Sequence, residues 1–518
     1  MAKASLIASL VIPPSPGGAE LAGLPASVEW LEVRSDLVGD LDADWLRSHF
    51  RGRLSYVLRS QAEGGNYSDS LEQRHRRLAA AARNYDRVEI EGSTDLSQSL
   101  LAQIPIEKRA VAWHGAADDL AELENRFRHL ASVPAALYKL VNRTTKIAAE
   151  LCPLFLLKSL QASGRSDTVA YSDGPMGFWT RLMALHLGAP AISGVVPNPS
   201  RTPDQLTVTQ LIQDYGLPEV MPIREIFAII GSPIFHSLSP RLHNAAYGAM
   251  GYNALFVPLH VESFDEFWQE LVQSRLLDSL GFPINGMTVA SPHKEVALLM
   301  AGLVSPMARQ AESANVLVRN NGSWRADTTD PEVIYMAGRE RSIRMSQRRA
   351  AVIGCGGAGR AIAAALVKSG AGVTLINRGA ERGHHAASLL GLPYISLPDF
   401  DAEGYDIVVN ATPVGRDSDE IPFKLEQLKN EAVVIDLVYG SRPTPLVGGT
   451  LAREQIAIDG RDVLLTQVLR QFHIMTNREM PASIASEMLG RRAPASEIVS
   501  PVHALIRTHA NTLGSDAN

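Results

Sequence analysis

The segment from residue 350 to residue 382 has the residue types and spacing needed to bind a dinucleotide. A short apolar run at 350–353 is followed by a glycine-rich turn and then by a helical pattern over 361–369. In a strand–turn–helix of this kind, the first glycine permits the tight turn, the second lets the backbone approach a pyrophosphate, and the third lets the helix pack closely on the strand. The helix N-terminus presents free N–H groups and a partial positive charge to the phosphates. The sequence therefore predicts a dinucleotide site at Gly354, Gly356, Gly357, Ala358 and Gly359.

The strand that follows the glycine-rich turn indicates which dinucleotide is bound. In sites for NAD this strand ends in an acidic residue that binds the ribose 2′-hydroxyl. Here the apolar run 373–376 ends in Asn377 and Arg378, and Arg382 follows about one helical turn later. Guanidinium groups bind a 2′-phosphate well, so the sequence favours NADP over NAD.

Apolar runs typical of buried strands occur eight times in the first 220 residues, at 6–12, 28–33, 54–58, 87–90, 110–113, 137–141, 168–171 and 191–196. Helical patterns separate them, among others at 70–84, 118–129, 144–159 and 176–187. This alternation of strand and helix predicts a (β/α)8 barrel. An open, doubly wound sheet is the alternative, because periodicity does not distinguish a closed sheet from an open one.

Polar residues occur near the ends of the predicted strands, where a (β/α)8 barrel has its active site. Lys139 stands out because its neighbours within 137–141 are apolar or aromatic. Burial of this kind lowers the pKa of an amine and makes it nucleophilic, as Schiff-base chemistry requires. The alternatives are a lysine that extends to solvent from an edge strand and one that pairs with Glu91. The other polar residues in such positions are Glu32, Arg34, Arg59, Glu63, His114, Arg181 and Gln205.

The segment before the glycine-rich turn contains residues suited to the reduction of a ketone. Ser237 and Ser239 precede a predicted helix, where hydroxyls and helix N–H groups can bind a carboxylate, although an ordinary N-cap would look the same. Lys294 follows a predicted strand, and Asp330 lies further along the chain. A lysine held by an aspartate can donate the proton that a ketone oxygen takes up during hydride transfer. Most Lys–Asp pairs are solvated surface charges, so this pair alone is not specific.

Length and composition limit the class of protein. A chain of 518 residues exceeds what one hydrophobic core supports, so two or three domains are expected. The net charge of −6 argues against nucleic acid as a partner. No apolar run is long enough for a membrane span and the N-terminus leaves no room for a targeting peptide, so a cytoplasmic location is expected. The two cysteines provide no disulfide framework, and no metal site is expected because the adjacent His384 and His385 point to different sides of a helix.

The polar residues of the first half resemble those of the type I 3-dehydroquinate dehydratases, over nearly all of residues 5–215. The resemblance rests on Glu32-x-Arg34, Leu58-Arg59-Ser60-x-x-Glu63-Gly64-Gly65, His114, Lys139 and Arg181. It implies a (β/α)8 barrel that dehydrates 3-dehydroquinate to 3-dehydroshikimate through an imine on Lys139. By the same resemblance, His114 moves protons with Glu63 orienting it, and Arg181 binds the substrate carboxylate. Hydroxyls and ring are bound by Glu32, Arg34, Arg59 and Gln205, and Arg201 stands where smaller residues are expected.

The second half resembles the shikimate dehydrogenases over roughly residues 225–510. The matching residues are Ser237-x-Ser239-Pro240, Pro292-His293-Lys294, Asn315, Thr329-Asp330, the glycine-rich turn, Asn377-Arg378, Asn410-Ala411-Thr412-Pro413, Asp436-x-x-Tyr439, Asp459-Gly460 and Gln467. The resemblance implies that Lys294 and Asp330 form the acid–base pair and that Ser237 and Ser239 bind the substrate carboxylate. It adds Asn315, Thr329, Tyr439 and Gln467 as substrate ligands and Asn410 and Thr412 to the NADP site. Thr328 stands where many relatives have asparagine.

Together the two resemblances imply an α/β protein that combines two consecutive enzymes. The expected domains are a TIM barrel at 1–220, a substrate-binding domain at 224–334 completed by C-terminal helices at 462–512, and a Rossmann-like NADP-binding domain at 335–461. The expected partners are the small molecules 3-dehydroquinate, 3-dehydroshikimate and shikimate, with no nucleic acid and no membrane. The oligomeric state is not predicted.

Two alternatives to this function are considered. One is a dehydrogenase that acts on quinate as well as shikimate, with a weak or inactive barrel. Ser239 argues against it, because relatives that prefer quinate tend to have glycine at that position. The other is a metabolite sensor without catalytic activity. It is disfavoured because the chain keeps both sets of reactive residues, Lys139 with His114 and Lys294 with Asp330.

Overall fold

The computed structural model describes residues 2–174, 177–198, 206–440 and 442–491. It divides into two compact units, Met1–Ile284 and Asn285–Asn518. The boundary falls within the segment 224–334, so the three predicted domains stay a prediction. Among the described residues, every helix falls short of the length and apolar character that a membrane span requires.

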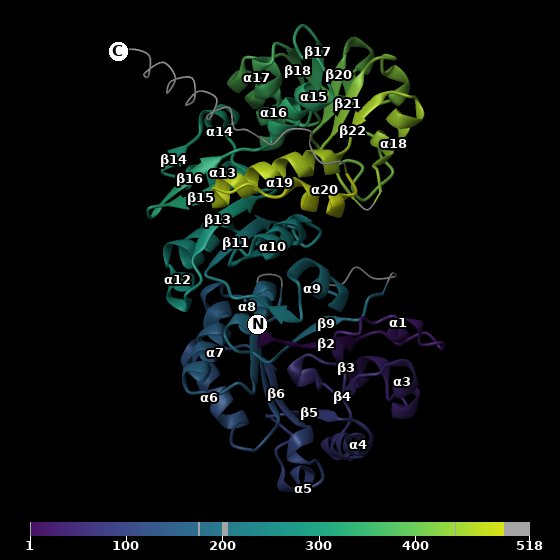
Figure 1. Ribbon diagram of the computed structural model, residues 1–518, viewed down its shortest axis with the longest axis vertical. Helices are drawn as coiled ribbons and strands as arrows, with labels where there is room; N and C mark the ends of the chain where they lie inside the picture. Colours follow the sequence, from purple (N-terminus) through teal and green to yellow (C-terminus); the bar gives the residue numbers. More distant parts are fainter. Residues whose placement is uncertain (1, 175–176, 199–205, 441, 492–518) are drawn as a thin grey trace, which may run out of the picture. The chain divides into compact units, whose positions relative to one another are not determined.

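An eight-stranded parallel sheet forms the centre of the first unit (Figure 1). Its strands are β2 (Ser5–Leu10), β3 (Val28–Arg34), β4 (Arg53–Val57), β5 (Arg87–Glu91), β6 (Arg109–Gly115), β7 (Leu137–Asn142), β8 (Thr168–Ser172) and β9 (Ala191–Val195). They pair in the order β8-β7-β6-β5-β4-β3-β2-β9, so the last strand lies beside the first. The described residues show no pairing between β8 and β9, and the barrel is therefore nearly closed. All eight predicted strands and the barrel architecture are confirmed.

Helices follow the barrel strands, and most begin where a side chain caps them. Ser70 accepts the N–H of Gln73 at the start of α4, and Thr207 and Gln210 form a capping box on α9. The helix predicted over 144–159 is wrong at its start: a 3-10 turn over Ala148–Leu151 precedes the helix itself, which has a proline in its first turn. The barrel helices are α1 (Ala19–Ala22), α2 (Ser35–Val38), α3 (Ala43–His49), α4 (Leu71–Asn84), α5 (Gln98–Leu101), α6 (Leu120–Leu130), α7 (Cys152–Ala162), α8 (Thr180–His186) and α9 (Val208–Tyr215).

The first unit continues beyond the barrel into a pair of parallel strands. These are β11 (Glu225–Gly231) and β12 (Ala254–His260), joined by α10 (Ser239–Met250). The short helices α11 (Phe264–Phe267) and α12 (Leu276–Leu280) follow. Two further short strands, β1 (Ala2–Lys3) and β10 (Glu219–Val220), pair antiparallel and tie the start of the chain to the end of the barrel.

The second unit contains two groups of strands. In the first group, β13 (Ile284–Val289) and β16 (Ser323–Asp327) both pair antiparallel with β15 (Val316–Asn320), and β14 (Leu303–Val304) pairs parallel with β16. The helices of this region are α13 (Lys294–Leu299), α14 (Pro306–Ala311) and α15 (Glu332–Glu340).

The second group of strands is a parallel sheet in the order β19-β18-β17-β20-β21-β22. Alternate residues of β17 face opposite cores, with Ala350 and Val352 on one side and Ala351 and Ile353 on the other. A parallel sheet covered on both faces is the predicted Rossmann-like arrangement, which is confirmed. The strands are β17 (Arg349–Ile353), β18 (Gly372–Asn377), β19 (Tyr394–Ser396), β20 (Ile407–Asn410), β21 (Val433–Asp436) and β22 (Ile456–Ile458). The helices are α16 (Gly357–Lys368), α17 (Ala380–Leu390) and α18 (Pro445–Ala452).

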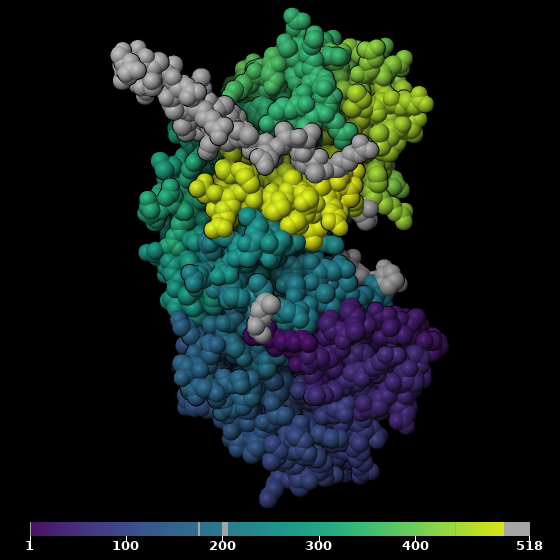
Figure 2. Space-filling view, viewed as in Figure 1, coloured from purple at the N-terminus to yellow at the C-terminus, as the bar shows by residue number. Residues whose placement is uncertain are grey.

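Two helices end the described part of the chain, α19 (Gly460–Thr476) and α20 (Ala482–Leu489). Both are visible in yellow at the surface of the second unit (Figure 2). Most of α19 is nevertheless buried, because its apolar residues pack inside the unit. The part of the predicted C-terminal segment beyond residue 491 lies outside the described residues.

Candidate active sites

A cavity of about 290 Å³ opens among the barrel strands. Because the strands are parallel, residues at their carboxyl ends meet at one rim of the barrel. Six of the residues predicted from the sequence line this cavity, namely Glu32, Arg34, Arg59, His114, Lys139 and Arg181. Gln205, and Arg201 before it, lie outside the described residues. The predicted convergence on one site is therefore observed for all the described members of this set except Glu63, which contacts the cavity residue His114.

Lys139 lies between two carboxylates. Its Nζ is 2.9 Å from Oε2 of Glu89 and 3.3 Å from Oε2 of Glu32, and all three side chains are buried. Burial alone lowers the pKa of Lys139, but Glu32 and Glu89 outweigh it and raise the pKa above its ordinary value. The lowered pKa of Lys139 expected from its apolar sequence neighbours is therefore wrong, and Lys139 pairs with Glu89 and Glu32 rather than with Glu91. The amine must lose a proton before it can act as a nucleophile.

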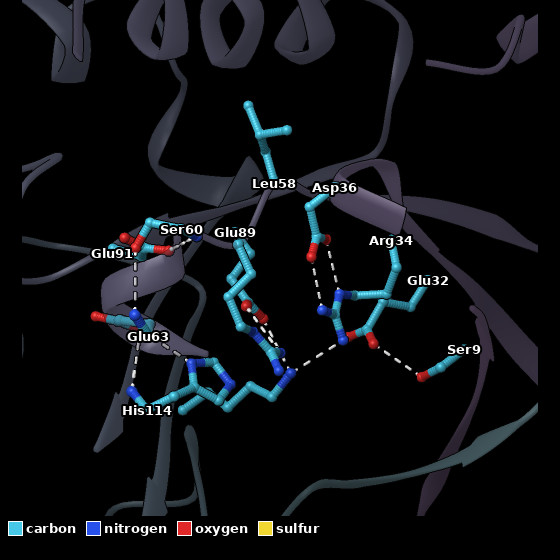
Figure 3. A network of polar contacts seen from close by, with 12 residues as sticks. Ser9, Glu32, Arg34, Asp36, Leu58, Ser60, Glu63, Glu89, Glu91 and His114 are labelled. Carbon is cyan, nitrogen blue, oxygen red and sulfur yellow. Dashed lines mark hydrogen bonds and ion pairs between the residues drawn. The ribbon is translucent and has the colours of Figure 1, made fainter. Parts of the chain in front are cut away.

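Glu32, the second carboxylate that pairs with Lys139, also contacts Ser9, as Figure 3 shows. Its Oε1 accepts the hydroxyl of Ser9 at 2.8 Å. Burial raises the pKa of Glu32, but Lys139, Arg59, Ser9 and Arg34 outweigh it and bring the pKa down to about 2. Glu32 is therefore ionised throughout the neutral range and balances the positive charges of the cavity.

His114 and Glu63 point toward one another beside this group (Figure 3). Oε2 of Glu63 accepts the backbone N–H of His114 at 3.0 Å and lies 3.0 Å from its Nδ1. Burial and the positive charges of Arg59 and Lys139 lower the pKa of His114 well below its ordinary value, so the ring is neutral. Nε2 of His114 is buried and has no hydrogen-bond partner among the described residues. The predicted orienting contact of Glu63 on His114 is thus present, and it leaves Nε2 available to exchange a proton in the cavity.

Replacing Glu63 by glutamine is expected to change how stability depends on pH. Burial, Glu91 and Glu89 raise the pKa of Glu63 from 4.5 to about 8. As pH rises from 4.5 to about 8, the unfolded chain loses a proton that the folded protein keeps. The carboxyl of Glu63 therefore lowers the unfolding free energy of the wild type by about 5 kcal/mol over this range. Glu63→Gln has no such cost. We therefore expect the unfolding temperature of Glu63→Gln minus that of the wild type to increase as pH rises from about 5 to about 8.

A matched control for this measurement is Glu72→Gln on α4, whose side chain is 75% exposed. The difference in unfolding temperature between Glu72→Gln and the wild type should stay nearly constant across this pH range. If the offset of Glu63→Gln stays constant as well, the carboxyl of Glu63 is already ionised in the folded protein and its raised pKa is refuted.

Several functional side chains of the cavity did not stand out in the sequence. Glu89 precedes Glu91 by two residues, so both point to the same face of β5, and only the fold shows that Glu91 instead accepts the N–H of Ser60 at 2.7 Å. Arg143 and Asp173, at the ends of β7 and β8, also line the cavity. Both could have been found from the sequence, because each is a charged residue that directly follows an apolar run, the pattern used to select candidates at other strands.

The arginines of the cavity are held by defined partners. Arg34 makes a bidentate pair with Asp36 at 2.8 and 2.7 Å, and Arg59 lies 3.6 Å from Glu89. Arg181 donates to the carbonyl of Ser193 at 3.1 Å, and its guanidinium lies 4.3 Å from the centre of the Tyr171 ring. These contacts fix guanidinium groups at the rim of the barrel, where a small anion can bind.

The second unit brings together a different set of predicted residues. Nζ of Lys294, at the start of α13, lies 2.8 and 3.0 Å from the two carboxylate oxygens of Asp330. Asn315 and Gln467 also donate to Asp330, at 3.0 and 2.9 Å. Asp330 is 1% exposed, so this pair is not one of the solvated surface pairs considered as an alternative. The aspartate holds the lysine in one orientation, as a proton donor requires.

A second layer of polar contacts surrounds this pair. Thr329 and Asn315 are hydrogen-bonded to one another, and Nε2 of Gln471 donates to Oγ1 of Thr329 at 3.2 Å. Gln471 was missed by sequence reasoning, although it lies one helical turn beyond Gln467 on α19. Thr328 accepts the N–H of Asp330 at 3.4 Å. Thr328 therefore contributes a hydrogen bond beside the acid–base pair.

The glycine-rich turn has the geometry predicted for it. Gly354 has φ of +103°, a conformation that glycine adopts at low cost, and a Cβ at Gly359 would strike the carbonyl of Gly354. No atom lies within 4 Å of the position that a Cβ of Gly356 would take, so the backbone faces open space there. Gly356 is the N-cap of α16. These features fit a pyrophosphate at the helix N-terminus.

The glycine-rich turn also lies against the acid–base pair. A Cβ at Gly357 would collide with Ser313 and would lie 3.5 Å from Cβ of Lys294. Arg360, 1% exposed on α16, donates to the carbonyls of Ala311 and Glu312 at 2.8 and 3.1 Å and pairs with Glu295 at 2.9 Å. The residue after Lys294 is therefore bound directly to the helix that begins at the glycine-rich turn.

The remaining predicted cofactor residues fall into two groups. Arg378 and Arg382 are exposed after β18. Asn377 instead accepts the N–H of Cys355 at 3.2 Å and donates to the carbonyl of Gly379 at 2.8 Å, so it shapes the turn. Asn410 is fully buried and joins Thr412 to Asp436, with contacts of 2.6 and 2.9 Å. These contacts position the loop after β20.

Three predicted substrate ligands lie outside these clusters. Ser237 accepts the N–H of Ser239 at 3.2 Å at the start of α10, and both belong to the first unit. Tyr439 is half-buried in the second unit. Their convergence with Lys294 and Asp330 stays a prediction. In the described ranges, no group of three or more histidine, cysteine or acidic residues is arranged to hold a metal ion. His385 pairs with Glu312, and His384 packs on Tyr394.

The fold and the two clusters define a class of protein: an enzyme with a lysine-containing barrel joined to a Rossmann-like module. Residues 20–221 match the family model described as type I 3-dehydroquinase, and residues 229–317 match the one described as shikimate dehydrogenase substrate binding domain. The chain belongs to the family of bifunctional type I 3-dehydroquinase–shikimate dehydrogenases.

The chain is similar to several known proteins over part or most of its length. A chloroplastic bifunctional 3-dehydroquinate dehydratase/shikimate dehydrogenase of Arabidopsis thaliana is 26% identical over 84% of this chain and 75% of the relative. A shikimate dehydrogenase (NADP(+)) of Methanothrix thermoacetophila is 35% identical over 50% of this chain and 94% of the relative. A crystal structure of shikimate 5-dehydrogenase from Thermus thermophilus, in complex with NADP(H) and shikimate, is 27% identical. It covers 51% of this chain and 98% of that chain, with a TM-score of 0.46.

Proposed function

We propose that this chain dehydrates 3-dehydroquinate to 3-dehydroshikimate in the barrel and reduces 3-dehydroshikimate to shikimate with NADPH in the second module. The proposed domains are the barrel at 1–220, the substrate-binding domain at 224–334 with the C-terminal helices at 462–512, and the NADP-binding domain at 335–461. The proposed location is the cytoplasm.

In the barrel, Lys139 passes a proton to Glu89, its nearest carboxylate, and then attacks the substrate ketone. Loss of water gives an imine, whose protonated form withdraws electrons from the adjacent carbon. Nε2 of His114 takes the proton from that carbon and then gives it to the departing hydroxyl, with Glu63 holding the ring. Hydrolysis of the imine consumes one water and frees Lys139, so the net reaction releases one water.

The substrate is held by the charges that line the cavity. Arg181 binds its carboxylate, since a guanidinium held in place by Ser193 and Tyr171 is suited to donate to an anion. Hydroxyls and ring are bound by Glu32, Arg34, Arg59 and Gln205.

In the second module, Lys294 donates a proton to the substrate ketone oxygen while Asp330 keeps the ammonium group in place. NADPH, when bound, supplies the hydride for the substrate carbon. Ser237 and Ser239 bind the substrate carboxylate, and the hydroxyls are bound by Asn315, Thr329, Tyr439 and Gln467.

NADPH fits the residues that would hold it. The open space at Gly356 and the free start of α16 accept the pyrophosphate, with Gly354, Gly357, Ala358 and Gly359 forming the turn. The exposed Arg378 and Arg382 bind the 2′-phosphate. Asn377, Asn410 and Thr412 position the loops around the cofactor.

The observation that carries the proposal is the buried group formed by Lys139, Glu89 and the His114–Glu63 pair, of which Lys139 and His114 line the barrel cavity. The test is NADPH oxidation by the whole purified chain given only 3-dehydroquinate. We expect oxidation to begin after a lag and to be faster with NADPH than with NADH. Activity with 3-dehydroshikimate but not with 3-dehydroquinate would refute the dehydratase assignment, and no activity with either would support a sensor instead.

A further inference from the structure

Asp173 lies in the dehydratase cavity beside the residue that binds the substrate carboxylate. Its Oδ1 is 3.4 Å from Nη2 of Arg181, and its backbone N–H donates to the carbonyl of Asn142 at 2.8 Å. The backbone contact fixes the residue at the end of β8, so only its side chain can change partner. A carboxylate of the protein is therefore already paired with the guanidinium that a substrate carboxylate needs.

Arg143 provides a second cation for the same carboxylate. Its Nε is 3.9 Å from Oδ2 of Asp173, and its Nη1 donates to the carbonyl of Glu63 at 2.8 Å. It also packs on Gly64, where a Cβ would collide with the guanidinium. Burial and the charge of Arg59 lower the pKa of Arg143, and Asp173 is the carboxylate that counters these effects. Asp173 thus lies between two guanidinium groups with separate anchors.

The two arginines differ in what holds them. Arg181 rests on the Tyr171 ring and on the carbonyl of Ser193, and neither contact needs Asp173. If a ligand carboxylate takes the place of Asp173 at Arg181, the guanidinium can stay where it is. The displaced side chain then has Arg143 as its remaining cation, so the exchange leaves no buried charge unpaired.

We propose that Asp173 is a positioning residue that competes with the substrate carboxylate for Arg181, and that Arg143 retains Asp173 when the substrate displaces it. Through the exchange, Asp173 keeps Arg143 as a partner of opposite charge and Arg181 keeps a carboxylate. Ligands without a carboxylate gain nothing from it, so the exchange contributes to specificity for acidic substrates. This inference rests on the proposed dehydratase function of the cavity.

The test compares Asp173→Asn, Arg143→Met and the double variant in the full chain, with kcat and KM of dehydration measured separately. Asp173→Asn removes the competitor, and we expect its KM for 3-dehydroquinate to fall about two- to fivefold, as for a partly exposed ion pair. Arg143→Met leaves Asp173 on Arg181 and should raise KM by a similar factor. In the double variant, Arg143→Met should change KM little relative to Asp173→Asn alone, because the carboxylate that Arg143 would hold is no longer present.

Two controls separate competition from other effects. Asp167→Asn changes an aspartate that pairs with Arg165 just before β8 and is 37% exposed; its KM should match the wild type. If Asp173→Asn lowers KM only because the cavity becomes more positive, salt should screen the effect. If it removes a direct competitor for Arg181, the lower KM should persist at about 0.5 M KCl. The thermal unfolding of the same samples reports whether the barrel of each variant is folded.

The outcomes are distinct. A KM of Asp173→Asn that is unchanged or higher, or effects of the two changes that add, would overturn the proposal. Loss of kcat with KM unchanged would assign Asp173 to another role and overturn it as well. Absence of dehydration in the wild type would instead refute the proposed function of the cavity, so the two failures can be told apart.

Discussion

Lys139→Ala is expected to lower the rate of 3-dehydroquinate dehydration by about 10,000-fold or more, because Lys139 is the one amine among the described residues that line the cavity. Its buried amine lies between Glu32 and Glu89 and lines the same cavity as His114, whose ring is held by Glu63. Oxidation of NADPH with 3-dehydroshikimate should stay near the wild-type rate, since the second module does not use this residue. The measurement is NADPH oxidation with each substrate in turn.

The matched control is Lys146→Ala, which removes a lysine with a 64% exposed side chain from the segment that follows the same strand. It should dehydrate 3-dehydroquinate normally. Borohydride treatment in the presence of 3-dehydroquinate should add mass to the wild type and to Lys146→Ala but not to Lys139→Ala. If Lys139→Ala is still active, or still gains mass, another nucleophile operates and the imine at Lys139 is refuted.

Lys294→Ala is expected to lower kcat for reduction of 3-dehydroshikimate by about 100- to 10,000-fold, the usual contribution of a positioned proton donor. The hydrogen bonds from Lys294 to Asp330 orient its ammonium group, and no second lysine is paired with Asp330 in the described residues. Dehydration in the barrel should continue, which can be followed by the absorbance of the conjugated enone product.

A control with the same kind of pair is available in Lys429→Ala. Lys429 lies 2.9 Å from Asp406, but the two side chains are 41% and 21% exposed and neither was predicted to bind a ligand. Its kcat should match the wild type. A value of kcat for Lys294→Ala within about tenfold of the wild type would show that the proton comes from elsewhere, such as solvent.

The barrel could be predicted because its information is local. Each of its strands is a short apolar run such as 137–141, and each run is bounded by residues that end a strand. The glycine-rich turn was equally clear, since the positive φ of Gly354 and the close packing at Gly359 require glycine. The late start of α7 was not predicted, because a helical pattern over 144–159 does not show where the first turn tightens.

The pKa of Lys139 could not be predicted for a different reason. Its sequence neighbours are apolar, and they indicated only the effect of burial. The opposing effect comes from Glu32, 107 positions away in the chain, and from Glu89, 50 positions away. Which of Glu89 and Glu91 faces the lysine depends on how β5 and β7 are placed around the barrel. Charge balance in a buried site is thus a property of the assembled strands.

Arg360 and Gly357 have a consequence for redesign of the second module. Arg360 binds the residue after Lys294, and a side chain at Gly357 would press on Ser313 and approach Lys294 itself. Substitutions in the glycine-rich turn that are intended to change nucleotide preference will therefore alter proton delivery as well. Arg378 and Arg382 are not part of these contacts, and they are exposed side chains that follow β18. Coenzyme preference is best altered there, since the reaction centre is then left intact.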